Sequence, residues 1–338
     1  MTTSGQAGPA GAGIEFADPA LAEAILDEMA RVEELLHSAV RSDFPFVTET
    51  ALHLVEAGGK RFRALLTLLS AQFGTDGIGE DVVKAAAVVE LIHLATLYHD
   101  DVMDEATMRR GAASANARWN NTVAILTGDY LFAHASALVA DLGTDAGRIM
   151  SRTFAELVTG QMRETTGPAG DEDPVEHYLQ VIAGKTGSLI ATSARFGGMF
   201  SGAKEDHVAA LERFGAVIGA AFQISDDIID IASASEESGK TPGTDLREGI
   251  RTLPVLHALA QDGPTADRLR VLLAGPVTDD ALVAEALGLL RDSSGMVTAR
   301  ATLADYAERA RAELAVLPSC PARESLEKLT DFVVERTT

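Results

Sequence analysis

The sequence contains a single cysteine, Cys320, among its 338 residues. One cysteine cannot form an internal disulfide and supplies no cysteine cluster for zinc. Basic residues are also few: 28 Lys and Arg stand against 50 Asp and Glu, which gives a net charge of −22. A chain without a basic footprint is a poor candidate for nucleic-acid binding. An anionic substrate must therefore be held by local cations or by bound metal.

Long uninterrupted apolar runs are missing as well. No run reaches the about 18 residues that indicate a transmembrane helix. The first residues, MTTSGQAGPAGAGIEF, lack the basic start and the apolar stretch of a secretory signal, and their Gly/Ala-rich composition predicts a disordered tail over residues 1–17. We expect a cytoplasmic protein with no transmembrane segment.

Strand signals are absent too, because no segment alternates like a half-buried strand. Apolar residues instead recur at three- and four-residue spacing, as in LAEAILDEMARVEELLHSAV and VVKAAAVVELIHLATLYHDDVMDEA. Turn residues break this pattern at EAGGKR, FGTDGIGED, TGPAGDEDP and SASEESGKTPGTD, and none of these stretches reads as a linker between domains. The sequence predicts one all-helical domain over residues 18–335.

The first cluster of chemistry-bearing residues is Asp100, Asp101 and Asp104 in the stretch LYHDDVMDEATMRRG. At ~100° per residue these three side chains share one arc of a helix, where like charges destabilise it. Two interpretations stay open at this point. The cluster is either a solvated acidic face or a magnesium site, since Mg²⁺ binds carboxylates together with phosphate oxygens.

A second cluster repeats the same spacing in QISDDIID, with Asp226, Asp227 and Asp230. Its flanks, GAVIGAAFQ and IIDIA, are too apolar for a solvated helix surface. Carboxylates in such surroundings must be paired or bind metal. The repeat therefore favours metal binding, with the two helices facing each other to hold a diphosphate through Mg²⁺.

The sequence resembles the trans-isoprenyl diphosphate synthases, or polyprenyl synthetases, of the medium- or long-chain type. The two aspartate motifs carry this resemblance, together with GGKRFR, the histidine of ELIHLATLYHDD, RRG, GKT and GKTPGTDLREGIRTLP. The resemblance implies an all-α orthogonal bundle around a deep central cavity, usually in a homodimer. It also implies the head-to-tail joining of an allylic diphosphate to isopentenyl diphosphate, with about three Mg²⁺ per active site held by the six aspartates.

By the same resemblance, the cations divide between two diphosphates. Isopentenyl diphosphate would be bound by Lys60, Arg63, His93 and Arg110, with Lys60 and Arg63 sharing one face at a helix start after Gly58-Gly59. The allylic diphosphate would be bound by residues from three parts of the chain: Arg109, Lys185, Thr186, Gln223 and Lys240.

Three sequence features bear on the residues expected to bind the allylic diphosphate: two glycines, the loop that contains Lys240, and the segment GQMRET at 160–165. Gly184 and Gly187 flank Lys185 and Thr186, and they predict a local departure from helical geometry there. Lys240 lies in a Gly/Ser/Pro-rich loop that would close over the phosphates. Gln161 replaces an acidic residue that is more usual in this family, which leaves details of the allylic pocket open.

Product length in this family depends on side chains one turn or two before the first aspartate motif. Thr96 and Ala95 are small where short-chain synthases often carry Phe or Tyr, and Ile92 lies one turn further down. A small side chain where a floor would be lets a growing chain pass, so we expect a product of roughly C30–C50, such as a quinone side-chain precursor. Tyr98 is either a gate or a packing residue.

Four alternatives remain. The first is a short-chain synthase making C15 or C20 products, and the second is a class I terpene cyclase, whose second metal motif normally differs from the one seen here. A metal phosphohydrolase is disfavoured because the eight histidines do not form metal-ligand spacings. A non-catalytic subunit of a heteromeric synthase would have lost aspartates or the RRG, all of which are present. Delivery of a greasy product to a membrane surface also stays open.

Overall fold

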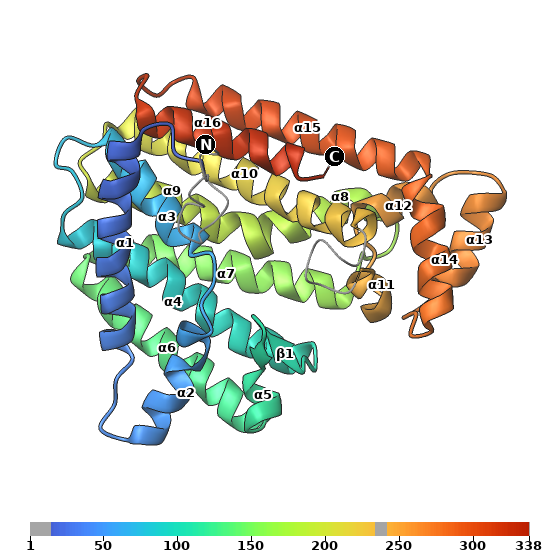
Figure 1. Ribbon diagram of the computed structural model, residues 1–338, viewed down its shortest axis with the longest axis horizontal. Helices are drawn as coiled ribbons and strands as arrows, with labels where there is room; N and C mark the ends of the chain where they lie inside the picture. The colour runs from blue at the N-terminus through green and yellow to red at the C-terminus, as the bar shows by residue number, and fades with distance from the viewer. Residues whose placement is uncertain (1–14, 234–241, 338) are drawn as a thin grey trace, which may run out of the picture. The chain divides into compact units, whose positions relative to one another are not determined.

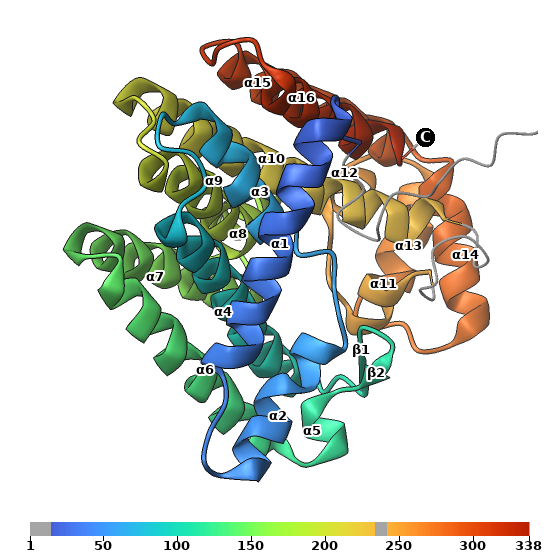
Figure 2. The same ribbon diagram turned by 60° about the vertical axis from the view of Figure 1, so that its left-hand side comes forward.

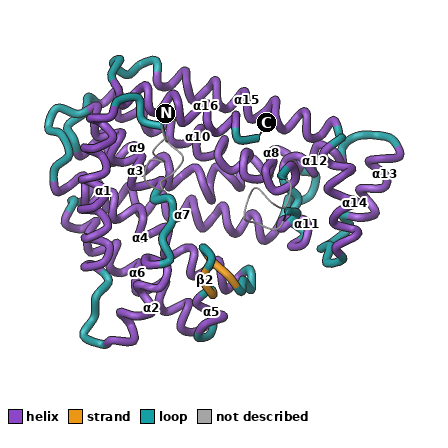
Figure 3. Tube along the Cα trace, viewed as in Figure 1, coloured by secondary structure: helices purple, strands orange, loops and turns teal. Residues whose placement is uncertain are grey.

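The computed structural model of the chain describes residues 15–233 and 242–337. Regular structure in these residues is helical except for one short antiparallel hairpin, β1 (Met108–Arg109) and β2 (Ala112–Ala113). Figure 3 shows this hairpin in orange among purple helices. The all-α prediction is confirmed, whereas the deep central cavity stays a prediction.

The described chain divides into two compact units. The first unit comprises residues 15–154, 189–215 and 314–329, and the second comprises residues 155–188, 216–313 and 330–337. Five helices have residues in both units: α7 (Thr144–Thr166), α9 (Ser188–Phe200), α10 (Glu205–Ala232), α15 (Ser294–Leu314) and α16 (Pro321–Glu335). The first aspartate motif belongs to the first unit and the second motif to the second, so each is described within its own unit. A single domain over residues 18–335 stays a prediction.

The first unit is built around one buried helix, α4 (Glu80–Met103), which packs against α1, α3, α5 and α6 (Figures 1 and 2). Apolar residues occupy all sides of α4, and a helix that is hydrophobic all round is an inner helix. The other elements of this unit are α1 (Pro19–Ala39), α2 (Pro45–Glu56), α3 (Phe62–Ser70), η1 (Ala71–Phe73), α5 (Ala115–Arg118), α6 (Asn121–Asp141) and α9 (Ser188–Phe200).

The second unit holds shorter helices besides its parts of the five shared ones. Its helix α12 packs against α8, α13 and α14. The elements of this unit are α8 (Pro174–Ile182), the π-helical turn η2 (Ala183–Gly187), α11 (Thr244–Glu248), α12 (Leu253–Leu259), α13 (Pro264–Leu272) and α14 (Asp280–Arg291).

Helix starts follow the local sequence. Asp18 caps α1 by accepting from the N–H of Ala20, and Asn120 caps α6 by accepting from the N–H of Val123. The predicted break TGPAGDEDP contains Asp173, whose side chain caps α8. Short polar side chains at these positions satisfy backbone donors that the helix leaves free.

Three helices are long and apolar enough to cross a membrane by length and composition: α4, α6 and α10. None contains an unbroken apolar run of the about 18 residues expected of a transmembrane helix, because isolated polar residues interrupt each one. The lack of a transmembrane segment stays a prediction. The apolar stretch of α4 is 72% buried and that of α10 is 56% buried, so packing within the chain accounts for their composition. That of α6 is only 33% buried.

Candidate active site

The first aspartate motif lies at the C-terminal end of α4. Asp100 and Asp101 belong to its last turn, and Asp104 caps the helix, with its N–H donating to the Asp100 carbonyl at 2.8 Å. The C-terminal end of a helix carries partial negative charge, which disfavours carboxylates. The last turn of α4, which is fully described, contains no basic residue. A cation must therefore reach these carboxylates from another segment.

Arg109 supplies that cation. Its Nε donates to Asp101 Oδ1 at 2.6 Å, and its Nη2 lies 3.9 Å from Asp104 Oδ2. The β1–β2 hairpin sets this geometry, because its two turn residues, Arg110 and Gly111, have φ angles of 52° and 77°. Two successive residues with positive φ are typical of the tight turn that matches strand twist. The turn brings Arg109 back over the end of α4.

The Asp101 carboxylate has one satisfied oxygen and one that is not. Oδ1 accepts from Arg109, whereas Oδ2 is buried and has no hydrogen-bond partner among the described residues. Burial raises the pKa of Asp101, and Arg109 works against that rise. A buried oxygen without a partner destabilises the ionised carboxylate, and a bound cation would relieve this. The first motif therefore fits a divalent metal.

The described residues do not form a complete metal site on their own. Within residues 15–233 and 242–337, no three His, Cys, Asp or Glu side chains converge closely enough to hold an ion. Mg²⁺ commonly keeps several waters and binds through one or two carboxylates plus substrate phosphate oxygens. The arrangement suits an ion that shares its ligands with a substrate.

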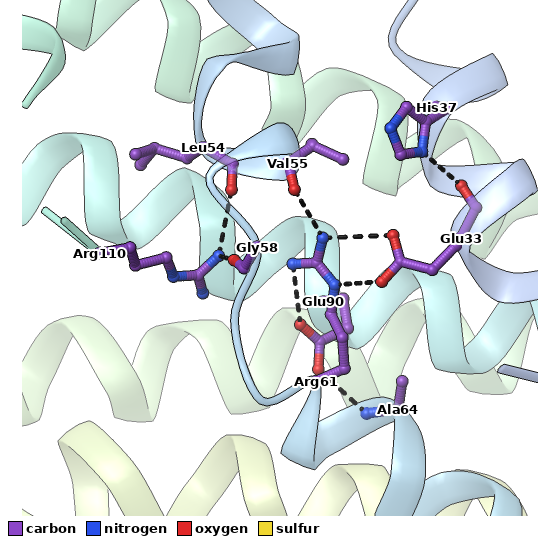
Figure 4. A network of polar contacts seen from close by, with 9 residues as sticks. All are labelled: Glu33, His37, Leu54, Val55, Gly58, Arg61, Ala64, Glu90 and Arg110. Atoms are coloured by element: carbon purple, nitrogen blue, oxygen red, sulfur yellow. Dashed lines mark hydrogen bonds and ion pairs between the residues drawn. The ribbon is translucent and has the colours of Figure 1, made fainter. Parts of the chain in front are cut away.

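Arg110 points to a different place from Arg109. Its Nη1 donates to the carbonyl of Leu54, at 3.1 Å, and to that of Gly58 (Figure 4). A Cβ on Gly59 would lie 2.7 Å from the Arg110 guanidinium carbon, so only glycine allows this approach. The structure thus directs the paired arginines to two sites, with Arg110 at the loop between α2 and α3.

The other two cations expected at this loop, Lys60 and Arg63, lie in different local structures. Helix α3 begins at Phe62, so Arg63 lies in its first turn, whereas Lys60 is exposed in the preceding loop. The expectation that both share a helix face was wrong, because Arg61 between them adopts a left-handed conformation with a φ of 45°. Burial lowers the pKa of Arg63 to about 10, with Glu90 opposing this effect and Arg110 adding to it.

His93 faces the same group of cations from α4. Burial lowers its pKa well below the usual range, and the nearby charges of Arg63 and Arg110 lower it further. An imidazole among guanidinium groups stays neutral because protonation would add a like charge. Arg63, His93 and Arg110 therefore form one electrostatically linked group, as the sequence predicted.

The second aspartate motif lies on α10, and each of its carboxylates has a partner. Asp226 forms an ion pair with Arg336 at 2.9 Å. Asp230 accepts from the N–H groups of Thr244 and Asp245 at the start of α11, at 3.1 and 3.3 Å. The requirement that buried carboxylates be paired is thus met by side chains and backbone of the second unit.

Asp227 is the most deeply buried of the three. Tyr178 donates its hydroxyl to Asp227 Oδ2, and Gln223 donates its Nε2 to Oδ1 at 2.9 Å. Thr186 in turn donates to Gln223 Oε1 at 3.2 Å, so these two residues lie in contact. Burial raises the pKa of Asp227 to about 7 against the effect of its two donors, and Asp226 and Asp230 add to the rise. A cation near Asp227 would favour its ionised form.

Lys185 lies in the π-helical turn η2, where the sequence predicted a departure from regular geometry. Its Nζ forms an ion pair with Glu164, to which Gln161 also donates at 3.1 Å. A Cβ on Gly160 would lie 2.4 Å from the Lys185 backbone nitrogen. The glycine therefore allows α7 to approach this turn closely. Lys240, the remaining predicted ligand of the allylic diphosphate, lies outside the described residues.

The three predicted chain-length residues differ in exposure. Ile92 and Ala95 are buried, at 1% and 0% exposure. Thr96 is partly exposed, and its hydroxyl donates to the His93 carbonyl at 2.8 Å. Of the three, only Thr96 offers appreciable surface to a ligand in this structure.

The open question about Tyr98 is answered by its contacts. Its side chain is fully buried, and its hydroxyl donates to the Thr50 carbonyl at 2.5 Å and accepts from the N–H of Leu54 at 3.2 Å. These bonds tie α4 to α2. Tyr98 is a packing residue.

Sequence reasoning missed Arg61, whose charge acts on His93 and Arg110, and three residues that contact predicted site residues: Glu164, Tyr178 and Arg336. Each lies far along the chain from at least one of its polar partners. Arg61 had a signal in GGKRFR, but its neighbours Lys60 and Arg63 read alike as cations. Tyr178 and Arg336 had no signal, because neither lies in a recognisable motif.

Comparison with known proteins agrees with this geometry. A sequence model described as Polyprenyl synthetase matches residues 45–290. The chain is 57% identical over 325 residues to nonaprenyl diphosphate synthase of Mycobacterium tuberculosis, covering 96% of this chain and 97% of the relative. It is 38% identical over 311 residues to heptaprenyl diphosphate synthase component 2 of Geobacillus stearothermophilus, covering 92% and 96%.

A solved structure is similar as well. The crystal structure of geranylgeranyl pyrophosphate synthase from Corynebacterium glutamicum, complexed with calcium and isoprenyl diphosphate, has a TM-score of 0.87 and 52% identity, with 96% of this chain and 99% of that one covered. The fold and the paired aspartate motifs define an all-helical enzyme of prenyl transfer. The chain belongs to the polyprenyl synthetase family.

The contacts of Tyr98 lead to a stability prediction. Tyr98→Phe should lower the free energy of unfolding by about 1–3 kcal/mol, because the Thr50 carbonyl and the Leu54 N–H lose their buried partner. Urea unfolding followed by circular dichroism measures this. Tyr130→Phe is the matched control, since the Tyr130 hydroxyl makes only an exposed contact of 3.3 Å to the Arg41 carbonyl. An equal, small effect of both substitutions would contradict the packing role.

Proposed function

We propose that this chain is a Mg²⁺-dependent prenyltransferase that joins an allylic diphosphate to isopentenyl diphosphate, head-to-tail and with trans geometry, to build a polyprenyl diphosphate. Membership of the polyprenyl synthetase family supports this reaction class. The relatives at 57% and 52% identity are both named as synthases of prenyl diphosphates.

The observation that carries the proposal is the division of the Arg109–Arg110 pair. Arg109 lies on the carboxylates of the first aspartate motif, and Arg110 lies at the loop that carries Lys60. An enzyme with two diphosphate substrates needs two separate cationic positions, and adjacent arginines in a tight turn provide them. In this assignment Arg109 binds the allylic diphosphate and Arg110 binds isopentenyl diphosphate.

Metal ions belong to the allylic side of the site. The unpartnered oxygen of Asp101 and the oxygen-only donor set of both motifs favour a hard divalent cation. When bound, about three Mg²⁺ would neutralise the six carboxylates and offset the charge that develops on the departing diphosphate. Their holders would be Asp100, Asp101, Asp104, Asp226, Asp227 and Asp230.

Residues of the first unit orient the nucleophilic substrate. Lys60, Arg63 and Arg110 would bind the diphosphate of isopentenyl diphosphate, and His93 would donate to it from its neutral form. The C–O bond of the allylic diphosphate breaks, and the isopentenyl double bond attacks the resulting cation to form a C–C bond. A proton then leaves the adduct for the released diphosphate, so no protein nucleophile takes part.

Residues of the second unit act on the allylic substrate. Lys185 would exchange its ion pair with Glu164 for a diphosphate oxygen, and Lys240 would bind the same group. Thr186 and Gln223 would direct their oxygens towards the developing carbocation, an orientation that their mutual hydrogen bond supports.

For product length, we propose roughly C30–C50, because Thr96, the one of the three expected chain-length residues that offers surface, has a small side chain. The 57% identity to a nonaprenyl diphosphate synthase supports this range. A short-chain product of C15 or C20 is the second candidate, favoured by the 52% identity to a geranylgeranyl pyrophosphate synthase.

The assembly is proposed to be a homodimer in the cytoplasm that passes its product to a membrane surface or to a later enzyme. The match to a protein named as component 2 of a heptaprenyl synthase makes a partner chain the competing arrangement. A terpene cyclase and a non-catalytic subunit remain the less favoured functions, since both aspartate motifs and the Arg109–Arg110 pair are intact.

The test of function is incubation of the purified chain with Mg²⁺, labelled isopentenyl diphosphate and, separately, dimethylallyl, geranyl, farnesyl or geranylgeranyl diphosphate. Mass spectrometry after dephosphorylation reads the product. Chains of roughly C30 or longer are expected. Products that stop at C15 or C20 keep the reaction and contradict the length. Cyclised hydrocarbon without isopentenyl incorporation contradicts the reaction, and no product indicates a missing partner chain.

The division of the arginine pair predicts that substitution of each arginine raises KM for a different substrate. Arg109→Gln should raise KM for the allylic substrate by about tenfold or more, and Arg110→Gln should do so for isopentenyl diphosphate, because each loses a charge-assisted contact. The other KM should stay within about threefold in each variant. Steady-state kinetics in which the concentrations of both substrates are varied measures the two KM values. The assignment fails if both substitutions raise the same KM.

The exposure of Thr96 predicts where product length is set. Thr96→Phe should shorten the product, since a large ring would occupy space that a growing chain needs. Ala95→Phe is the contrasting variant. At this fully buried position a ring overpacks the core, and about 1–3 kcal/mol of unfolding free energy should be lost. Unchanged product length in a folded Thr96→Phe variant would locate the floor elsewhere.

A further inference from the structure

Arg61 is the most completely buried of the arginines around the α2–α3 loop, with 6% of its side chain exposed. Its Nε donates to Glu33 Oε1 at 2.5 Å and its Nη2 to the Val55 carbonyl at 2.9 Å. Its Nη1 lies 3.9 Å from Glu90 Oε2. Two carboxylates, from α1 and α4, therefore share this one guanidinium, as Figure 4 shows.

Glu90 has a second partner that belongs to the same network. Its Oε1 accepts from the N–H of Ala64 at 3.1 Å, in the first turn of α3. Glu90 is 1% exposed, and a buried carboxylate in that position is held both by the helix start and by Arg61. The network thus fixes the start of α3, which carries Arg63.

The loop before α3 is fastened from two sides. Arg61 holds the Val55 carbonyl, while Arg110 holds the carbonyls of Leu54 and Gly58. Lys60 lies between these attachments and is exposed. The left-handed φ of 45° at Arg61 is rarely adopted by a residue other than glycine. Arg61 in this conformation belongs to the network, whereas Lys60 is exposed.

Arg61 also balances charge, because both Glu33 and Glu90 are engaged by its guanidinium. Without Arg61, both would be unbalanced and would attract Arg63 and Arg110, competing with an anionic ligand for those cations.

We propose that Arg61, held by Glu33 and Glu90, is a positioning residue for isopentenyl diphosphate: it fixes the loop that presents Lys60 and Arg63 and keeps two carboxylates away from the diphosphate site. This inference rests on the proposed function, because it assigns the loop to the isopentenyl substrate. Arg61 acts through its neighbours and touches no reacting atom.

The test compares KM for isopentenyl diphosphate with kcat and with KM for the allylic substrate. Arg61→Met should raise KM for isopentenyl diphosphate by about tenfold or more and leave the other two constants within about threefold. Arg61→Lys should restore part of the loss, because it keeps the charge but not the forked contacts. Isothermal titration of each variant with isopentenyl diphosphate alone should show the same order of affinities.

Two further variants separate positioning from general damage. Glu90→Gln keeps an oxygen for the Ala64 N–H but weakens one of the two carboxylate contacts that hold Arg61, so KM for isopentenyl diphosphate should rise, though by less than in Arg61→Met. Arg195→Met is the matched structural control, since Arg195 pairs with Glu212 at 2.7 Å elsewhere in the first unit. It should leave KM for isopentenyl diphosphate within about threefold.

Each outcome has a distinct meaning. An unchanged KM for isopentenyl diphosphate in a folded Arg61→Met variant, or an equal rise for both substrates, overturns the inference. If Arg61→Met does not fold, Arg61→Lys and Glu33→Gln replace it, and no change of that KM in either overturns the inference too. Failure of the unsubstituted chain to incorporate isopentenyl diphosphate would instead contradict the proposed function.

Discussion

The contact between Arg109 and Asp101 is the interaction on which the rest of the site depends. It brings a cation from a tight hairpin to the negative end of α4, where three carboxylates would otherwise repel one another. It also leaves one Asp101 oxygen buried and without a partner among the described residues. In a protein of net charge −22, the first motif thus keeps a position that would suit a divalent cation bound together with an anionic substrate.

The balance of charge is reversed at the α2–α3 loop. There the cations Arg63 and Arg110 gather with a neutral His93, and the nearby acidic residues are engaged by Arg61. Excess negative charge marks the first aspartate motif, and excess positive charge marks the α2–α3 loop. Under the proposed function, the two diphosphates would be distinguished in this way, one by metal carried on carboxylates and one by direct contact with arginine and lysine.

The sequence predicted the helical class and the location of both aspartate motifs, because these depend on local spacing. It did not predict partners that lie far along the chain, such as Tyr178 for Asp227 or Arg336 for Asp226. Nor did it separate Arg61 from Lys60, since two adjacent basic residues read alike until the backbone conformation is known. The helix-start placement of Lys60 failed for that reason.

The apolar helices α4 and α6 were not predicted as such for a similar reason. Their mean hydropathy is high, but isolated polar residues interrupt the apolar run of each. Burial then distinguishes α4, which the first unit encloses, from α6, whose Leu126 is 61% exposed. Such a difference depends on tertiary packing and is not visible in composition.

The most direct test of this account measures isopentenyl incorporation against Mg²⁺ concentration for the unsubstituted chain, Asp101→Asn and Asp227→Asn. Both substitutions keep shape and remove a metal-holding charge. We predict that turnover falls by about 100-fold or more in each while the circular dichroism spectrum is unchanged. Turnover close to that of the unsubstituted chain in either variant would contradict the assignment of the two aspartate motifs as the metal-holding centre of the enzyme.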